Sequence, residues 1–450
     1  TCTEDGVKTY TCTVCKKTKT EAVKKTDHKW DSGTVTTADT CTADGVKTYT
    51  CTVCKQTKTE KIPAGHSWNT LVEVKATAFA YGNKKVKCRV CNEEKTETIK
   101  MLDVVSLNTL GALKVLQESE LASYGITDSS VPAKITGATY VTFGVYPQTI
   151  MASGVTVADG TAGVNNGTAI KNTEITGADY YLGSDGNWYA KAKEQANNSG
   201  YKYSDDTEVK QSSANSEKYF KVEPIVWRVL KDVDGKYMLL AEKLLTANVA
   251  YYGSTSNRTL SGTTVYANNY KYSNIRAWLN GTNNQFVTDG GTATAYDIDW
   301  SGKGFLQQVF TTTLQSKIAE TTVDNSAAST TDTNNTFQPA YNLACDNTTD
   351  RIFLLSVKEA TTAEYGFRAY YASGSGKNRI RKPTDYAKAN NCYTNENSNA
   401  ASGGQWWLRS PYYAYSGNAR DFDYDGYAID NGNGVYGTSD GVLPALFVTK

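Results

Sequence analysis

A tandem repeat at the start of the chain constrains its fold more than any other feature. The segment TCTEDGVKTYTCTVCKKTKTE (1–21) returns as TCTADGVKTYTCTVCKQTKTE (40–60), with a period of 39 residues. Each copy contains a lone Cys, a CxxC pair, and a later His that is followed two residues on by Trp. Modules this short bury too little apolar surface to fold alone and need a cross-link. The repeat therefore predicts small stapled β-rich modules.

The Cys and His residues of each copy suggest what the staple is. Three Cys cannot pair off as disulfides within one copy, and a His completes a tetrahedral Cys3His set of the kind that binds Zn²⁺. We therefore predict one structural Zn²⁺ in each of the first two copies. The predicted ligands are Cys2, Cys12, Cys15 and His28 in the first copy, and Cys41, Cys51, Cys54 and His66 in the second. The alternative is a disulfide from the lone Cys to one Cys of the CxxC pair, which an extracellular setting favours.

A third, degraded copy bears on this choice. The segment TAFAYGNKKVKCRVCNEEKTE (77–97) keeps Cys88 and Cys91, but it has Ala78 in place of the lone Cys, and no His follows. Joint loss of the lone Cys and the His is expected if all four side chains serve one site. For the third copy we expect a disulfide or a free dithiol. The expected module boundaries are 1–37, 38–75 and 76–101.

These modules resemble the threonine- and cysteine-rich tandem repeats on surface proteins of gut Firmicutes. The resemblance covers about the first hundred residues and implies a stalk or spacer rather than a catalyst.

Composition narrows the class of partner. The chain of 450 residues has 47 basic and 46 acidic side chains, so no global charge indicates nucleic acid or a membrane surface. No apolar run is long enough to span a bilayer. Abundant Thr, Asn, Gly, Ser and Tyr suit a β-rich protein that is extracellular or on the cell surface. Residue 1 is Thr, so we expect a processed or trimmed piece whose missing signal peptide says little about location.

The segment that follows the repeats predicts a linker. Within residues 102–134, the stretch NTLGALKVLQESELA (108–122) places leucines near one helical face. Asn108 or Thr109 can cap the start of this helix, and Gly125 can end it. We expect a linker helix docked on the next domain.

The remaining residues, 135–450, read as one domain of short β-like runs. Within it, YSNIRAWLNG (272–281) predicts a helix that begins at the N-cap Ser273 and stops at Gly281, and FLQQVF (305–310) predicts a second one. The motifs FGVYPQ, PIVWRVL, IRAWLN, IFLLS, TDYAKAN, WWLRSP and GVLPALFV occur in this order. Together they resemble an uncharacterised family of bacterial surface domains related to the C-type lectin fold, in its formylglycine-generating-enzyme-like branch. The resemblance implies an α+β class: a C-type-lectin-like domain with short helices and irregular loops. In the closing motif, Leu443 stands where the family usually has Arg.

Members of the family that this domain resembles also serve as variable proteins of diversity-generating retroelements, which mutate adenines, mostly at Asn codons of the final segment. Residues 412–441 contain no Lys, Glu, Gln, Met or Trp. Randomised Asn codons would yield the Tyr, Asp, Ser, Gly, Ala and Asn that dominate there. The alternative is an ordinary loop region rich in Gly, Asn and Asp.

The same tract resembles an antibody paratope, in which Tyr supplies rigid contact area and small polar residues adapt. We expect Trp406, Trp407 and Leu408 before it, and Ala445, Leu446 and Val448 after it, to be core. Within it, Phe422 and Ile429 are expected to be buried. The predicted ligand-binding residues are Tyr412, Tyr413, Tyr415, Asn418, Asp421, Asp423, Asp425, Tyr427, Asp430, Asn431, Asn433 and Tyr436.

The sequence of this domain argues against calcium binding and against catalysis. DFDYDG (421–426) begins like an EF-hand loop, but Gly432 stands where the bidentate carboxylate is needed, so we expect no calcium site. Residues 135–450 contain no His, the commonest general base, and no GxSxG or HExxH motif. Their only Cys residues, Cys345 and Cys392, are expected to form a structural disulfide or to remain as two buried thiols. We therefore expect no enzyme.

The function that these observations favour is an adhesin or receptor-like protein. Its expected partner is a protein or glycan on another cell, a phage or a host surface. The alternatives are a structural surface protein without a specific ligand, and an enzyme of the formylglycine-generating type.

Overall fold

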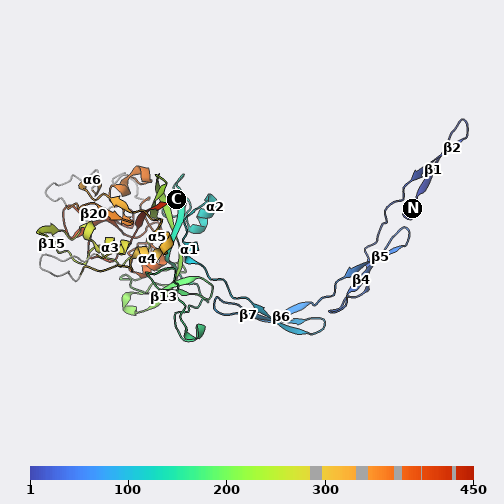
Figure 1. Cartoon of the computed structure of the whole chain (residues 1–450), viewed down its shortest axis with the longest axis horizontal. Coiled ribbons are helices and arrows are strands. Elements are labelled where there is room, and N and C mark those ends of the chain that lie inside the picture. The colour runs from blue at the N-terminus through green and yellow to red at the C-terminus, as the bar shows by residue number, and fades with distance from the viewer. Residues whose placement is uncertain (284–295, 331–342, 369–377, 397, 428–431) are drawn as a thin grey trace. The chain divides into compact units, whose positions relative to one another are not determined.

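The computed structural model describes residues 1–283, 296–330, 343–368, 378–396, 398–427 and 432–450 (Figure 1). The chain divides into two compact units, Thr1–Met101 and Leu102–Lys450, which are described separately. Strands outnumber helices in the described residues and the helices are short, which confirms a mostly β member of the α+β class. We find no helix in these residues with the length and hydropathy needed to cross a membrane.

The first unit contains three antiparallel sheets. They consist of β1 (Gly6–Thr11) and β2 (Thr18–Val23); β3 (Thr34–Thr37), β4 (Gly45–Thr50) and β5 (Thr57–Ile62); and β6 (Trp68–Val74), β7 (Gly82–Cys88) and β8 (Glu94–Ile99). Most side chains on these strands are exposed, so the sheets have little apolar core. The expected module boundaries after residues 37 and 75 fall inside sheets, because β3 pairs with β4 and β6 pairs with β7.

The expected linker belongs to the second unit, and the single helix predicted over 108–122 is wrong. The segment forms α1 (Leu107–Leu110), β9 (Lys114–Val115), α2 (Glu118–Leu121) and the 3-10 turn η1 (Ala122–Tyr124). Ser106 caps α1 by accepting the Thr109 N–H, and Gly111 ends it. Pairing of β9 with Val141 and Thr142 competes with the helix and replaces it. Gly125, with a φ of +76°, ends η1 rather than the helix predicted over 108–122.

An eight-stranded antiparallel sheet organises the second unit. Its main path runs β11-β12-β13-β14-β23-β19, with β10 paired to β13 and β9 to β10. The strands are β10 (Tyr140–Ile150), β11 (Tyr180–Leu182), β12 (Trp188–Lys193), β13 (Glu217–Val233), β14 (Lys236–Ala241), β19 (Ile352–Leu354) and β23 (Pro444–Thr449). Asp234 and Gly235 both have positive φ, so a two-residue turn with the twist of its strands connects β13 to β14.

Short elements pack around this sheet. Ser273 accepts the Arg276 N–H at the start of α3 (Asn274–Asn280), and Gly281 ends that helix in the left-handed region, as predicted. The second predicted helix is also confirmed, as α4 (Phe305–Val309). The other elements are α5 (Thr312–Gln315), α6 (Ala327–Thr330), α7 (Asp385–Ala389), η2 (Asn165–Gly167), η3 (Ser212–Ala214), η4 (Tyr270–Tyr272), η6 (Glu359–Thr361), η7 (Ala363–Tyr365), β15 (Arg258–Leu260), β16 (Thr263–Val265), β17 (Thr321–Val323) and β18 (Thr348–Asp350).

The predicted ligand-binding tract, residues 412–441, begins in a separate three-stranded sheet. This sheet consists of β20 (Trp406–Pro411), β21 (Asn418–Phe422) and β22 (Asn433–Gly434). The predicted core residues on either side of the tract, Trp406, Trp407, Leu408, Ala445, Leu446 and Val448, are all fully buried. Cys345 and Cys392 are free thiols, so the disulfide alternative for this pair is wrong.

Candidate metal centres and display surface

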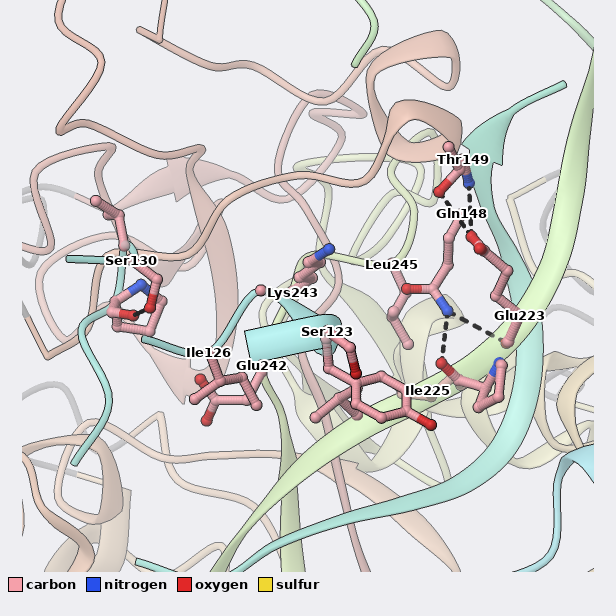
Figure 2. Close-up of a pocket in the computed structure, with 16 residues that line it drawn as sticks. Ser123, Ile126, Ser130, Gln148, Thr149, Glu223, Ile225, Glu242, Lys243 and Leu245 are labelled. Atoms are coloured by element: carbon pink, nitrogen blue, oxygen red, sulfur yellow. Dashed lines mark hydrogen bonds between the residues drawn. The ribbon is translucent and has the colours of Figure 1, made fainter. Parts of the chain in front are cut away.

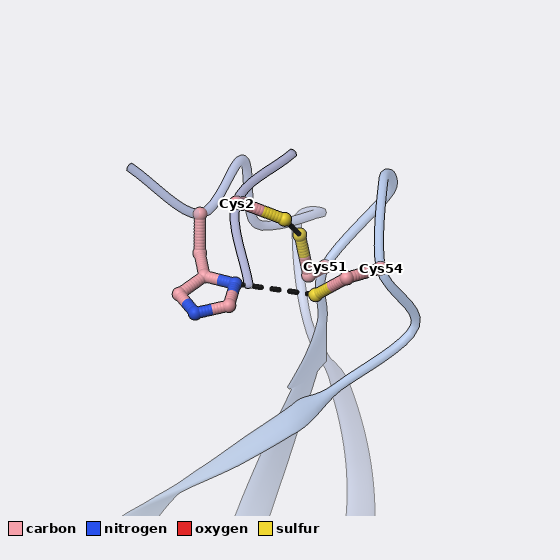
Figure 3. Close-up of side chains that lie close together, drawn as sticks. Cys2, Cys51 and Cys54 are labelled. Atoms are coloured by element: carbon pink, nitrogen blue, oxygen red, sulfur yellow. Dashed lines mark hydrogen bonds between the residues drawn. The ribbon is translucent and has the colours of Figure 1, made fainter. Parts of the chain in front are cut away.

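Two Cys3His sets come together in the first unit, but each draws on two copies of the repeat. The sets are Cys2, His28, Cys51 and Cys54, and Cys41, His66, Cys88 and Cys91. Within each set all the ligand atoms lie within 4.8 Å of one another. In Figure 3, the thiols of Cys51 and Cys54 converge on Cys2 and on the imidazole. The lone Cys and the His of one copy therefore meet the CxxC pair of the next copy.

This arrangement corrects the predicted ligand sets. Cys12 and Cys15 do not join Cys2 and His28, and Cys88 and Cys91 are free thiols beside Cys41 and His66, so the disulfide expected there is wrong. Strand pairing across copies is the cause. Residues just after His28 pair with the strand that leads into the next CxxC, with Trp30 bridged to Cys51. In the following copy, Trp68 pairs with Cys88 in the same way.

The third copy contained the signal that could have revealed this offset. It keeps its CxxC pair but has neither the lone Cys nor the His. A last copy that only accepts ligands from the copy before it needs the CxxC pair and nothing more.

The donor spacing fits a tetrahedral ion. Sulfur atoms at about 2.3 Å from a tetrahedral centre lie about 3.8 Å apart, and a sulfur and a nitrogen lie slightly closer. Cys2 Sγ is 3.7 Å from Cys51 Sγ, and Cys54 Sγ is 3.3 Å from His28 Nδ1. In the second set the corresponding distances are 3.4 Å between Cys41 and Cys88 and 3.4 Å between Cys91 and His66 Nδ1. Both sets could therefore bind a metal ion.

The thiols within a set differ in acidity. Burial raises the pKa of Cys2 to about 11, and the neighbouring thiols add to this effect. Burial also acts to raise the pKa of Cys51, but the N–H of Cys54 and the imidazole of His28 outweigh it and lower that pKa to about 5. In the second set, a hydrogen bond from the Cys91 N–H lowers the pKa of Cys88 to about 5. Burial raises the pKa of Cys41 to about 12. Each set thus holds one thiol that the local backbone stabilises as a thiolate.

The Trp that follows each His supports the imidazole. The rings of His28 and Trp30 are 5.1 Å apart, and those of His66 and Trp68 are 4.7 Å apart. Because Nδ1 faces a thiol in both sets, Nε2 points outward and can bond a second partner that orients the ring. His66 Nε2 lies 3.4 Å from a carboxylate oxygen of Glu93.

In the second unit, the structure separates the predicted ligand-binding residues by exposure. Tyr415, Tyr427 and Tyr436 are exposed, at 57%, 46% and 62%. Six others are half-buried: Tyr412, Tyr413, Asn418, Asp423, Asp425 and Asn433. Asp421 is fully buried, so its prediction as a surface contact is wrong. Asp430 and Asn431 lie outside the described residues, as does Ile429, which was predicted to be buried. Phe422 is buried as predicted.

Asn268, which the sequence did not single out, holds the loop at residues 412–418, where the predicted ligand-binding tract begins. Asn268 is fully buried, and its side-chain amide donates hydrogen bonds to the carbonyls of Tyr412 at 3.3 Å, Tyr415 at 3.4 Å and Asn418 at 2.8 Å. Its own backbone N–H donates to Ser416 O at 3.0 Å. No local pattern around residue 268 marks this role, because the loop lies far along the chain.

The aspartates of DFDYDG build a turn. Asp423 Oδ1 accepts the backbone N–H groups of Asp425 and Tyr427, both at 2.9 Å. Ser402 donates to Asp425 Oδ1 at 2.8 Å. These bonds use the carboxylate oxygens to hold the backbone that presents Tyr427.

A buried acid pair lies next to this turn. Asn433 Nδ2 donates to Asp421 Oδ2 at 2.8 Å and to Asp440 Oδ1 at 3.0 Å. Burial raises the pKa of Asp440 to about 7. Burial, followed by the charges of Asp440 and Asp423, raises the pKa of Asp421 well above its ordinary value. The pair therefore retains bound protons at pH values where exposed carboxylates are ionised.

The second unit also contains a cavity of about 320 Å³ (Figure 2). Gln148 Nε2 donates to the carbonyls of Glu223 at 3.2 Å and Pro224 at 2.9 Å on one wall. Glu242 lies on another wall, and its carboxylate is 3.6 Å from Nε of the buried Arg228. No His or Cys is among the residues that line the cavity.

The comparisons with known proteins concern the second unit. No curated protein and no solved structure matches the chain. Residues 234–450, which include β14, β23 and all three exposed tyrosines of the tail, match the model of a family described as a domain of unknown function (DUF6273).

Proposed function

We propose that the chain is an extracellular ligand-binding protein of the adhesin or receptor-like kind. The second unit displays a binding surface, and the first unit acts as a metal-stapled spacer. One observation carries this proposal: Tyr415, Tyr427 and Tyr436 are exposed, and buried or half-buried side chains hold the backbone at Tyr415 and Tyr427.

Held aromatic side chains are suited to recognition. Tyr offers a large contact area with a polar tip and loses little conformational entropy on binding. A loop that is already ordered avoids part of the entropic cost of association. A Cβ on Gly417 would lie 2.9 Å from the Tyr415 ring, and one on Gly434 would lie 2.8 Å from the Tyr436 ring. Close packing on a glycine therefore restricts two of the three rings.

In the first unit, we propose Zn²⁺ as the bound ion. Three thiolates and one imidazole in a tetrahedral arrangement form a donor set that suits Zn²⁺. The sheets bury little apolar surface, so metal binding would supply much of their folding free energy.

For the second unit, we propose a C-type-lectin-like fold and a tail diversified at adenines. The composition of residues 412–441 supports the diversification hypothesis. It predicts a near-identical template copy in the neighbouring DNA, differing only at adenines, beside a reverse-transcriptase gene. The partner would be a protein or glycan on another cell, a phage or a host surface.

The binding proposal can be tested on the full chain. A variant with Tyr415→Ser, Tyr427→Ser and Tyr436→Ser is compared with the parent on arrays of glycans and bacterial surface proteins. Because a few aromatic anchors usually carry most of the affinity, the triple variant should lose the parent's specific signals and keep its melting temperature. Exposed Tyr10 and Tyr81 provide the matched control: changing both to Ser should preserve binding. Equal binding by the parent and the triple variant would refute the proposal.

A further inference from the structure

The first copy of the repeat contains a third CxxC turn that is built like the two turns in the metal sets. In each turn, the N–H of the first Cys donates to a carbonyl five residues later, and an N–H four residues later donates back to that Cys. These bonds join Cys12 to Lys17 and Lys16, Cys51 to Gln56 and Lys55, and Cys88 to Glu93 and Asn92, at 2.8 to 3.1 Å.

The three turns also share an unusual backbone conformation. Lys16, Lys55 and Asn92 have positive φ values of 58°, 63° and 62°. A lysine adopts this region at an energetic cost. The Cys15 N–H points at Cys12 Sγ at 3.5 Å, much as the Val90 N–H points at Cys88 Sγ at 3.4 Å. The Cys12 turn therefore has the local geometry of a metal-binding turn.

The three turns differ in whether a lone Cys and a His complete a metal set with them. Cys2 and His28 precede Cys51 by 49 and 23 residues, and Cys41 and His66 precede Cys88 by 47 and 22. Neither metal set includes Cys12 or Cys15, and both residues are exposed. Cys2, the other Cys of this copy, already belongs to the first set.

We propose that Cys12 and Cys15 form the acceptor half of a third Cys3His metal site. Its other two ligands would be a Cys and a His from a further copy of the same repeat. Binding of a divalent ion would release the thiol protons to solvent, with no change of oxidation state. This inference rests on the proposed metal binding of the two complete sets. The donor copy can be a tandem neighbour in the same polypeptide or part of a second molecule.

The experiment extends the full chain by one repeat. A duplicate of residues 1–39 is placed directly before Thr1. Because the period is 39 residues, the added Cys and His fall 49 and 23 residues before Cys12, the same separations as in the first set. Tightly bound zinc is counted per chain after dialysis against a competing chelator. Cobalt substitution then reports the number of thiolate ligands through the charge-transfer absorption.

The parent chain should hold two ions, and the extended chain should hold three in similar Cys3His environments. The control carries the same extension with Ser in place of the duplicated Cys2 and Asn in place of the duplicated His28. This control should hold only two ions. Sedimentation distinguishes the donors: a monomeric extended chain with three ions indicates a tandem neighbour. A third ion that appears in the extended chain only with dimerisation indicates a second molecule as the donor, because both His residues of the parent already belong to the two complete sets.

Other outcomes would overturn the inference. An extended chain that holds only two ions, or that forms a stable Cys12–Cys15 disulfide despite the added donors, would refute the third site while leaving the two complete sets intact. A parent chain without bound metal would refute both the third site and the proposed zinc spacer.

Discussion

The buried pair of Asp421 and Asp440 predicts that the stability of the second unit depends on pH. Asp440 is almost fully buried, and its folded-state pKa of about 7 exceeds the ordinary Asp value of about 3.9. The folded protein therefore binds this proton more tightly than the unfolded chain does. The resulting stabilisation is complete below about pH 4 and is lost as the pH rises through about 7.

The size of the effect follows from the shift. One pKa unit corresponds to about 1.4 kcal/mol, so a shift of roughly three units corresponds to at most about 4 kcal/mol. Asp440→Asn removes the ionisation and keeps an oxygen that can accept the Asn433 amide, which lies 3.0 Å from Oδ1. The variant should match the parent near pH 4.5 and exceed its stability at pH 8 by a few kcal/mol.

Urea denaturation followed by Trp fluorescence between pH 4.5 and 8 measures this difference. Contributions from the first unit cancel between the variants, because Trp30 and Trp68 are unchanged. The exposed Asp234→Asn should keep the parent's pH dependence, since that side chain lies in water on a turn with positive φ. A difference between Asp440→Asn and the parent that stays constant across the pH range would refute the reasoning.

Three further predictions concern other parts of the molecule. Cys51→Ser should lower the zinc content from two ions to one, whereas Cys12→Ser should leave it at two; loss of one ion on Cys12→Ser would restore ligand sets confined to one copy. Glu242→Gln should destabilise the second unit by about 3–5 kcal/mol in denaturant titrations, because it leaves the buried guanidinium groups of Arg228 and Arg381 without their facing charge. Asn268→Ala should speed amide hydrogen exchange across residues 412–418 and lower the free energy of unfolding by about 1–3 kcal/mol, because three carbonyls lose a buried donor. Unchanged exchange there would show that other contacts hold the loop.

Where the deciding interaction is local, the sequence alone was sufficient. Helix α3 begins at a serine hydroxyl that bonds its own first turn and ends at a glycine with positive φ, so residues 273–281 contain their own boundaries. The burial of Trp406, Trp407 and Leu408 followed from an apolar run. The chemistry of Cys and His likewise indicated Cys3His sets before any geometry was known.

Tertiary structure decided which residues meet. The Cys12 and Cys51 turns have the same local sequence, so only the pairing of Trp30 with Cys51 determines which turn receives Cys2 and His28. Sheet pairing also converted residues 114–115 from predicted helix into strand. In the tail, Asp421 pairs with Trp407 inside a sheet, while Tyr427 follows a turn at the surface. The composition of the tract does not distinguish these two positions. Whether each side chain is buried depends on contacts with residues far away in the chain.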